Sequence, residues 1–392
     1  MFDSIGRIFL AALAIVLIAC GVEVALRVRE FQALDQSTGP QSTGLPREHS
    51  RSTCLELPSA WYGVGRNAES GEPLPLRVNA LGLRGPELSA GPAPGTLRII
   101  CLGDEQTLAD GLPEENLWTA GLSGFLEKSA GRPVEVINAG LPGGCPLTEY
   151  IHYRRLLQPL APNVVILELH VSDAAEDARL RPHLRNDGQG TPVAVVHPSL
   201  EASESPVARL AENFALVRWF VARAGSELTA RQGPVAFEDF QTQLLAWNPE
   251  AGATPGEAVP RVLQPIAHLK TLLDNQGATL VVCAFPNAWQ ASELLRSSDR
   301  ESGENNLLNR PALTAKAACQ AWGVEFIDLT AVVLQSQRIS QLYLPNGSGL
   351  STAGHALLAE EVARRLTASP AAEPSAAPAG VADRLDVFGS PQ

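Results

Sequence analysis

The sequence has few basic residues and no cluster of them. Its 392 residues include 30 Lys and Arg against 42 Asp and Glu, which gives a formal net charge of -12. Nucleic acids and anionic lipid surfaces are bound by clustered Lys and Arg side chains. The balance of charge therefore argues against a nucleic-acid partner.

The six cysteines lack the spacing of a metal or redox motif. No two of them form a CxxC pair, so the sequence predicts neither a zinc ribbon nor a redox site. Cys101 and Cys283 lie inside apolar runs, where a free buried thiol is the usual state. We expect no disulfide framework and no cofactor.

Residues 1–30 are expected to be a membrane anchor or a signal segment. They contain an uncharged apolar run from Ile8 to Val22, which reaches the roughly 20 residues of a span if Glu23 lies at the interface. An uncleaved signal anchor, a cleaved lipoprotein signal ending before Cys20 and a buried soluble helix all stay open. We expect the first or second, which tether the chain to a membrane with its soluble domain outside the cytoplasm.

Composition divides the rest of the chain into three parts. Residues 31–95 are expected to form a linker and a small N-terminal extension, because a Gln-Ser-Thr-Gly repeat cannot bury a core. Residues 96–368 carry the pattern of one large domain, and the Pro/Ala-rich residues 369–392 are expected to be disordered. The helical stretch at residues 199–246 interrupts the pattern, and we interpret it as a packed insertion or, alternatively, a substrate lid.

Apolar runs rich in Val and Ile alternate with helical stretches in the large domain. The expected strands are residues 97–103, 134–140, 163–171, 278–286 and 324–329, and helices are expected at 116–131, 259–277 and 351–366. Continuous apolar runs are typical of strands buried on both faces of a parallel sheet. The predicted fold class is α/β, a three-layer α/β/α sandwich with a central parallel sheet, whose functional groups lie at the carboxyl ends of the strands.

Two acidic residues follow the first expected strand, in the segment Gly103-Asp104-Glu105-Gln106-Thr107. This segment and three later ones resemble, in order, the signature blocks of the SGNH hydrolases, also called GDSL-type esterases and lipases. The resemblance extends from about Thr96 to Leu366. It implies a first block of Gly-Asp-Ser-x-Thr with the serine as nucleophile, whereas this chain has Glu105 at the serine position.

The second and third blocks supply the oxyanion hole in that family. Gly143, in "VINAGLPGG", matches the glycine whose backbone N–H contributes to it, and a backbone donor survives most substitutions. The third block, Gly-x-Asn-Asp, reads His170-Val171-Ser172-Asp173 here. Asp173 is kept, but Ser172 replaces the asparagine, and a serine hydroxyl is too short to reach the same point.

The last block, Asp-x-x-His, matches Asn346 and Gly349. His355 matches a second histidine inside the following helix, and we expect it to be structural. A serine nucleophile needs an imidazole base held by a carboxylate, and losing the nucleophile or the base alone costs on the order of 10⁶ in turnover. The resemblance therefore implies a membrane-anchored SGNH-fold protein whose catalytic residues are degenerate.

Two functions without a serine nucleophile stay open for this site. In the first, which we favour, Asp104, Glu105, Gly143 and Asp173 bind a cationic or hydroxyl-rich ligand, glycans included, in a non-catalytic or scaffold protein. In the second, Asp104, Glu105, Asp173 and His170 converge as a carboxylate- or metal-dependent enzyme.

A third function is ester hydrolysis by relocated residues, a carbohydrate or lipid deacylase. Ser172, Ser348 or Ser351 would then act with a histidine from elsewhere, although Ser348 and Ser351 fit the loop and the cap of the last helix better. Upstream, "VNALGLRGPEL" resembles a segment that precedes the hydrolase domain in many anchored members. We expect Arg84 in this segment to form a surface or interdomain salt bridge. The alternative is that it binds a carboxylate or phosphate ligand.

Overall fold

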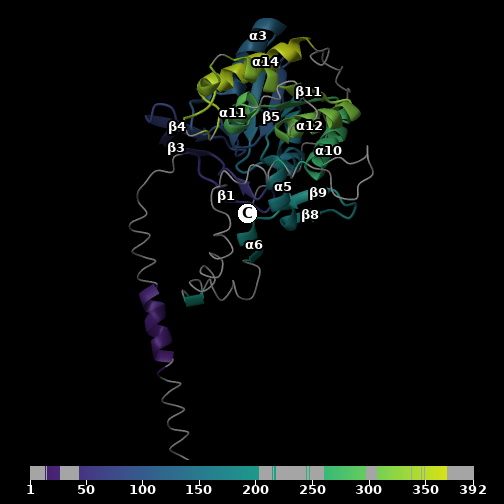
Figure 1. Cartoon of the computed structure of the whole chain (residues 1–392). Helices are drawn as coiled ribbons and strands as arrows, with labels where there is room; N and C mark the ends of the chain where they lie inside the picture. Colours follow the sequence, from purple (N-terminus) through teal and green to yellow (C-terminus); the bar gives the residue numbers. More distant parts are fainter. Residues whose placement is uncertain are drawn as a thin grey trace, which may run out of the picture.

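A computed structural model describes most of the large domain and parts of the N-terminal region (Figure 1). The described residues are 14, 16–26, 44–202, 214, 216–217, 244, 247, 260–296, 307–336, 338–345, 347 and 349–368. Most of the predicted spacer, most of the 199–246 stretch, the 369–392 tail and residues 346 and 348 lie outside them.

Part of the predicted N-terminal anchor is described as a helix, at residues 16–26. The Glu23 side chain accepts a hydrogen bond from the backbone N–H of Leu216 at 2.8 Å, so residue 216 of the insertion lies beside this helix. Among the described residues, none of the helices combines the length and the apolar character needed to cross a bilayer. The membrane anchor therefore stays a prediction.

A five-stranded parallel sheet forms the centre of the domain, in the order β11-β10-β7-β5-β6. Its strands are β5 (Leu97–Gly103), β6 (Val134–Gly140), β7 (Val164–Leu169), β10 (Thr279–Ala284) and β11 (Glu325–Asp328). All five predicted strands are confirmed. Every residue of β5 and β7 is buried, as expected for inner strands covered on both faces.

Helices pack on both faces of the sheet and give it three layers (Figure 1). The helices on one face are α3 (Trp118–Ala130), α13 (Thr330–Gln335) and α14 (Thr352–Ala368), and those on the other are α4 (Pro146–His152), α10 (Gln264–Asp274) and α12 (Arg310–Ala321). The predicted helices at 116–131, 259–277 and 351–366 correspond to α3, α10 and α14. Gly131 ends α3 in the left-handed conformation at φ 62°, as its sequence indicates.

The remaining helices and strands complete the described part of the domain. They are α5 (Asp173–Leu180), α6 (Pro198–Ala202), α11 (Ala288–Arg296), and three antiparallel pairs: β1 (Glu48–His49) with β2 (Leu55–Glu56), β3 (Trp61–Arg66) with β4 (Pro73–Val78), and β8 (Leu184–Asn186) with β9 (Pro192–Val195). The buried leucines of β4 pack against Leu108, in the turn of chain that follows β5. The N-terminal extension is thereby attached to the corner that carries Glu105.

Candidate functional site

A four-residue helix, α2 (Glu105–Leu108), turns the chain away from the end of β5. The Asp104 carboxylate caps it by accepting a hydrogen bond from the backbone N–H of Gln106 at 2.8 Å. Gln106 and Thr107 point inward, and both donate to the buried Glu168 carboxylate of β7, at 2.8 and 3.0 Å. With its neighbours held in this way, Glu105 is left exposed at the corner.

The Glu105 carboxylate binds the predicted oxyanion donor. Its Oε1 accepts a hydrogen bond from the backbone N–H of Gly143 at 2.6 Å. Gly143 has a φ of +60°, which a residue with a side chain adopts only under strain. Surrounding protein, and then the neighbouring Asp104 carboxylate, raise the pKa of Glu105, while the Gly143 hydrogen bond lowers it. Solvent reaches this exposed side chain and reduces the first effect.

His170 and Ser172 are in contact at the carboxyl end of β7. The Nδ1 of His170 lies 2.6 Å from Ser172 Oγ and 3.7 Å from an oxygen of Asp104. Both contacts fall on one ring nitrogen, whereas a hydrolase triad needs the hydroxyl on one nitrogen and the carboxylate on the other. Burial lowers the pKa of His170 to about 4, against the opposing effect of Glu105, so the ring is neutral at pH 7.

The same contact recurs on the surface, where it begins a different helix. His197 Nδ1 lies 2.8 Å from Ser199 Oγ and accepts a hydrogen bond from the Ser199 backbone N–H at 3.2 Å, at the start of α6. His170 Nδ1 likewise accepts from the Ser172 backbone N–H, at 3.4 Å, before α5. A histidine two residues before a serine is therefore a local capping arrangement in this chain, and it does not by itself indicate a catalytic dyad.

A cleft of about 520 Å³ brings the first and last blocks together. Its lining includes Glu105, Gly349, the turn of the β3–β4 hairpin and the loop after α2: Arg66, Asn67, Ala68, Gly71, Gln106, Ala109, Asp110, Gly111, Leu112, Leu344, Leu350 and His355. A Cβ atom built on Gly349 would meet nothing within 4 Å. The position that should hold the histidine base is thus open space at the same cleft as Glu105. Asn346, predicted at the aspartate position, lies outside the described residues.

His355 and Ser351 serve the structure, as the sequence predicts. His355 is buried, and its Nδ1 accepts a hydrogen bond from the Trp118 backbone N–H at 3.2 Å, at the start of α3. Burial, and then the Arg84 charge, lower the pKa of His355 to about 3. The Ser351 hydroxyl oxygen accepts from the Gly354 backbone N–H at 3.2 Å and so caps α14.

Arg84 holds the loop after α2 in place. Its guanidinium is buried and donates to the backbone carbonyls of Leu108, Ala109 and Leu112, the first at 2.7 Å. The expectation of a salt bridge or an anionic ligand is therefore wrong for this residue. Burial lowers the pKa of Arg84 to about 10, against the opposing effect of Asp110. Its role is to position the segment that follows Glu105.

Buried carboxylates beneath the cleft escaped the sequence analysis. Glu149 of α4 is fully buried, and neither of its oxygens has a hydrogen-bond partner among the described residues. Burial raises the pKa of Glu149 well above its ordinary value, and nearby Asp104 and Glu168 add to this. Burial likewise raises the pKa of Glu168 to about 8. A glutamate inside the apolar run "VVILEL" was the one available signal for Glu168.

Two of the three acidic residues predicted to converge, Asp104 and Asp173, lie beside His170. Asp173 accepts a hydrogen bond from the His170 backbone N–H at 2.8 Å, and Asp104 lies 3.7 Å from its ring. Burial raises the pKa of Asp173 well above its ordinary value, with Glu149 as the next cause, and burial raises that of Asp104 to about 6. Among the described residues, no three His, Cys, Asp or Glu side chains are arranged to hold a metal ion.

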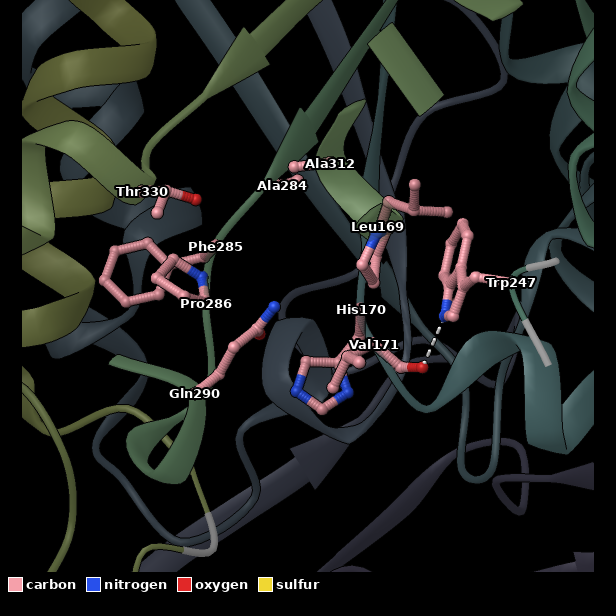
Figure 2. A pocket seen from close by; sticks show the side chains of 11 residues that line it. Leu169, His170, Val171, Trp247, Ala284, Phe285, Pro286, Gln290, Ala312 and Thr330 are labelled. Atoms are coloured by element: carbon pink, nitrogen blue, oxygen red, sulfur yellow. Dashed lines mark hydrogen bonds between the residues drawn. The ribbon is translucent and has the colours of Figure 1, made fainter. Parts of the chain in front are cut away.

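A second, much smaller cavity lies beside His170, at the ends of β7 and β10 (Figure 2). Its volume of about 20 Å³ is room for about one water molecule. Trp247 is buried beside it and donates from its indole N–H to the carbonyl of Val171 at 2.8 Å (Figure 2). Of these two cavities, the Glu105 cleft is the one with space for a ligand of several atoms.

Similarity to known proteins is found among solved structures. No family model and no curated protein sequence matches the chain. Similar solved structures include the lipase/acylhydrolase from Enterococcus faecalis, at 12% identity over 69% of this chain and 96% of that one, with a TM-score of 0.36. The acetyl xylan esterase AlAXEase is 13% identical over 69% of this chain and 100% of its own, with a TM-score of 0.38.

Axe2, an acetylxylan esterase from Geobacillus stearothermophilus, is 10% identical over 69% of this chain and 94% of its own, with a TM-score of 0.38. These values describe similarity alone. The likeness to the SGNH hydrolases is described from the arrangement of this chain. Its sheet is parallel, Glu105 accepts a hydrogen bond from the Gly143 N–H, and Glu105 and Gly349 line the same cleft. The chain thus resembles the SGNH hydrolases in its fold and in where the block positions meet, and it departs from them in the side chains at those positions.

Proposed function

We propose that the chain is an SGNH hydrolase-like protein that binds a ligand in the Glu105 cleft without hydrolysing esters. The observation that carries the proposal is the hydrogen bond of 2.6 Å from Gly143 to Glu105. The nucleophile position therefore holds a hydrogen-bond acceptor without a hydroxyl. That acceptor occupies the backbone N–H that would stabilise an oxyanion.

The remaining groups at the cleft do not restore the missing steps. Attack of the Glu105 carboxylate on an ester would form a mixed anhydride, and Gly349 supplies no base to activate water for its breakdown. The Ser172 hydroxyl and the His170 ring are neighbours, but their contact has the form of a helix cap, and both it and the approach of Asp104 fall on the same ring nitrogen, so the described residues do not form a triad here. The arrangement therefore favours binding over turnover.

The lining of the cleft favours a polar, hydroxyl-rich or cationic ligand. Carboxylates at Glu105 and Asp110 and the amide of Asn67 supply hydrogen-bond acceptors and donors, and the volume of about 520 Å³ accommodates a small sugar-sized molecule. We propose that such a ligand, a glycan among the candidates, is bound by a domain tethered to a membrane outside the cytoplasm.

A reversion experiment tests the proposal. The full-length chain and a Glu105→Ser, Asn346→Asp, Gly349→His triple variant are assayed on p-nitrophenyl acetate, with the Glu105→Ser single variant as a control. We expect no turnover by the natural protein or the single variant and measurable turnover by the triple variant. Esterase activity in the natural protein that survives Glu105→Ala would sink the proposal.

The ligand class is tested by binding. Glucosamine oligomers and neutral oligosaccharides of the same length are titrated into the natural protein and the Glu105→Gln variant, each followed by calorimetry. We expect the cationic oligomers to lose about tenfold in affinity on removal of the carboxylate charge, and the neutral ones to lose less. No binding of either class to the natural protein would contradict the choice of ligand.

A further inference from the structure

We infer that the Glu105 cleft binds an acidic sugar, whose carboxylate or phosphate group contacts Arg66 while its hydroxyl groups donate to Glu105. The inference rests on the binding function proposed above and names the class of ligand. It gives Arg66, a residue of the β3–β4 hairpin outside the four signature blocks, the role of selecting an anionic ligand over a neutral one.

Arg66 lines the cleft with most of its donors unused. It is the exposed last residue of β3, and its Nη1 donates to the carbonyl of Gly71 across the hairpin turn at 2.5 Å. This contact fixes one end of the guanidinium, and no other hydrogen bond or ion pair engages Arg66 within the described residues. The free N–H groups suit a carboxylate or a phosphate, because the planar fork of an arginine can bond two oxygens of such a group at once.

Asn67, the next residue, extends this donor surface. Its Oδ1 accepts hydrogen bonds from the backbone N–H groups of Glu69 and Ser70, at 2.8 and 3.2 Å, so the oxygen is held by the hairpin turn. The amide nitrogen is then the end of the side chain that has no partner in the described part of the chain. Arg66 and Asn67 both line the cleft, and the hairpin wall therefore presents N–H donors that the turn already orders.

Acceptors line the same cleft at the corner after β5. The Oε1 atom of Glu105 accepts from Gly143, and its Oε2 atom has no hydrogen-bond partner among the described residues. The charge of Asp110 is partly offset, because its carboxylate lies 3.6 Å from Arg47 and accepts the Leu45 backbone N–H at 3.0 Å. Glu105 is thus the cleft carboxylate with an oxygen available to a ligand.

Arg66 and Glu105 are opposite charges that face one cavity without pairing. Neither forms an ion pair with any described residue, although both line the same space of about 520 Å³. A neutral or purely cationic ligand uses Glu105 and leaves the Arg66 charge without a partner. A sugar that carries hydroxyl groups and one anionic group engages both, and such complementarity of charge favours it over its neutral counterpart.

Digalacturonate tests the inference beside its methyl ester, which has the same ring hydroxyls and no charge. Both are titrated by calorimetry at pH 7 into the full-length natural protein and the Arg66→Gln, Arg66→Lys and Arg77→Gln variants. Arg77 is exposed on the same hairpin and bonded to Glu114, so its variant is the matched control for the loss of one positive charge.

The expected loss is specific to the acidic sugar. Arg66→Gln should bind digalacturonate about fivefold more weakly than the natural protein does, which is the size of an exposed charge pair. Arg66→Lys, which keeps the charge without the fork, should have an intermediate affinity, and Arg77→Gln should match the natural protein. Affinity for the methyl ester should be the same in all four proteins.

Salt and a second acidic sugar complete the test. Added NaCl should weaken the binding of digalacturonate to the natural protein more than to Arg66→Gln, because salt screens exposed charges. Galactose 6-phosphate, titrated in the same way, distinguishes phosphate from carboxylate as the recognised group. Binding of either acidic sugar that depends on Arg66 supports the inference and identifies that group.

Three results would overturn the inference. The first is an unchanged affinity of Arg66→Gln for both acidic sugars, and the second is an equal loss of affinity for digalacturonate and its methyl ester, which would assign the effect to the hairpin turn. The third is failure of the natural protein to bind either acidic sugar. The proposed function is decided separately, by the ester assay and the glucosamine titrations, so its failure and that of the inference are distinguishable.

Discussion

The Glu69 carboxylate, in the turn of the β3–β4 hairpin, binds Thr352 at the start of α14. One of its oxygens accepts the Thr352 backbone N–H at 2.7 Å, and the other accepts the Thr352 hydroxyl at 2.8 Å. The hairpin turn and the loop containing Gly349, which are two walls of the same cleft, are therefore tied together by one side chain. The N-terminal extension thus contributes to the site, beyond serving as a connection.

Replacing Glu69 is expected to loosen this wall. Glu69→Ala removes the carboxylate that caps the N-terminus of α14, and capping groups contribute about 1 kcal/mol. We expect a loss of about 1 kcal/mol in the free energy of unfolding and faster amide exchange in residues 66–71, measured by denaturant titration and hydrogen exchange. Glu72→Ala, an exposed glutamate on the same hairpin, is the control. Unchanged exchange at the hairpin turn would show that the contact is dispensable.

Arg84 is expected to tolerate no shorter or uncharged substitute. Arg84→Met leaves the carbonyls of Leu108, Ala109 and Leu112 without their donors, and each unsatisfied buried group costs about 1 to 3 kcal/mol. We expect a total loss of roughly 3 kcal/mol in unfolding free energy, since the three carbonyls can relax together. Arg84→Lys restores a single donor group, so its unfolding free energy should lie between those of the natural chain and Arg84→Met. A Met variant as stable as the natural chain would contradict this role.

Gly349→His is expected to be tolerated by the fold. A Cβ at this position meets nothing within 4 Å, and its φ is not in the left-handed region. The free energy of unfolding, measured by denaturant titration, should change by no more than about 0.5 kcal/mol, which is typical of open surface sites. Gly143→Ala is the contrast, because it forces a side chain into a φ of +60° and should cost about 1 kcal/mol or more. A destabilised histidine variant would mean that the open space is needed.

Glu149→Gln is expected to change how stability depends on pH. The pKa of Glu149 is raised by burial in the folded chain, so the folded state holds its proton over a range where the unfolded state has lost it. Stability is therefore greatest below the unfolded pKa and falls as pH rises toward the folded pKa. The glutamine variant cannot ionise, so unfolding measured at pH 5 and pH 8 should show a smaller decrease than in the natural protein. Glu360→Gln, on the exposed face of α14, should keep the natural dependence.

The sheet could be predicted because its strands are recorded locally in the sequence. Runs such as those of β5 and β7 are apolar at every position, and only a strand covered on both faces requires that pattern. Their ends then located Glu105 and His170 at the site edge. Arg84 was misjudged because the sequence around an arginine does not show whether its guanidinium donates to carbonyls or pairs with a carboxylate. The carbonyls that accept from Arg84 lie more than twenty residues away along the chain.

The sequence by itself determined the parallel sandwich. It also determined that catalytic side chains are missing, since a glutamate, a serine and a glycine stand at block positions where the hydrolase reaction requires other side chains. Only the tertiary structure decided what those positions do instead. It brought Glu105 onto the N–H of Gly143, 38 residues further along the chain, and left Gly349 facing open space. The reason is physical: composition and periodicity report which residues are buried, whereas a hydrogen bond between distant loops depends on how the whole sheet aligns its strand ends.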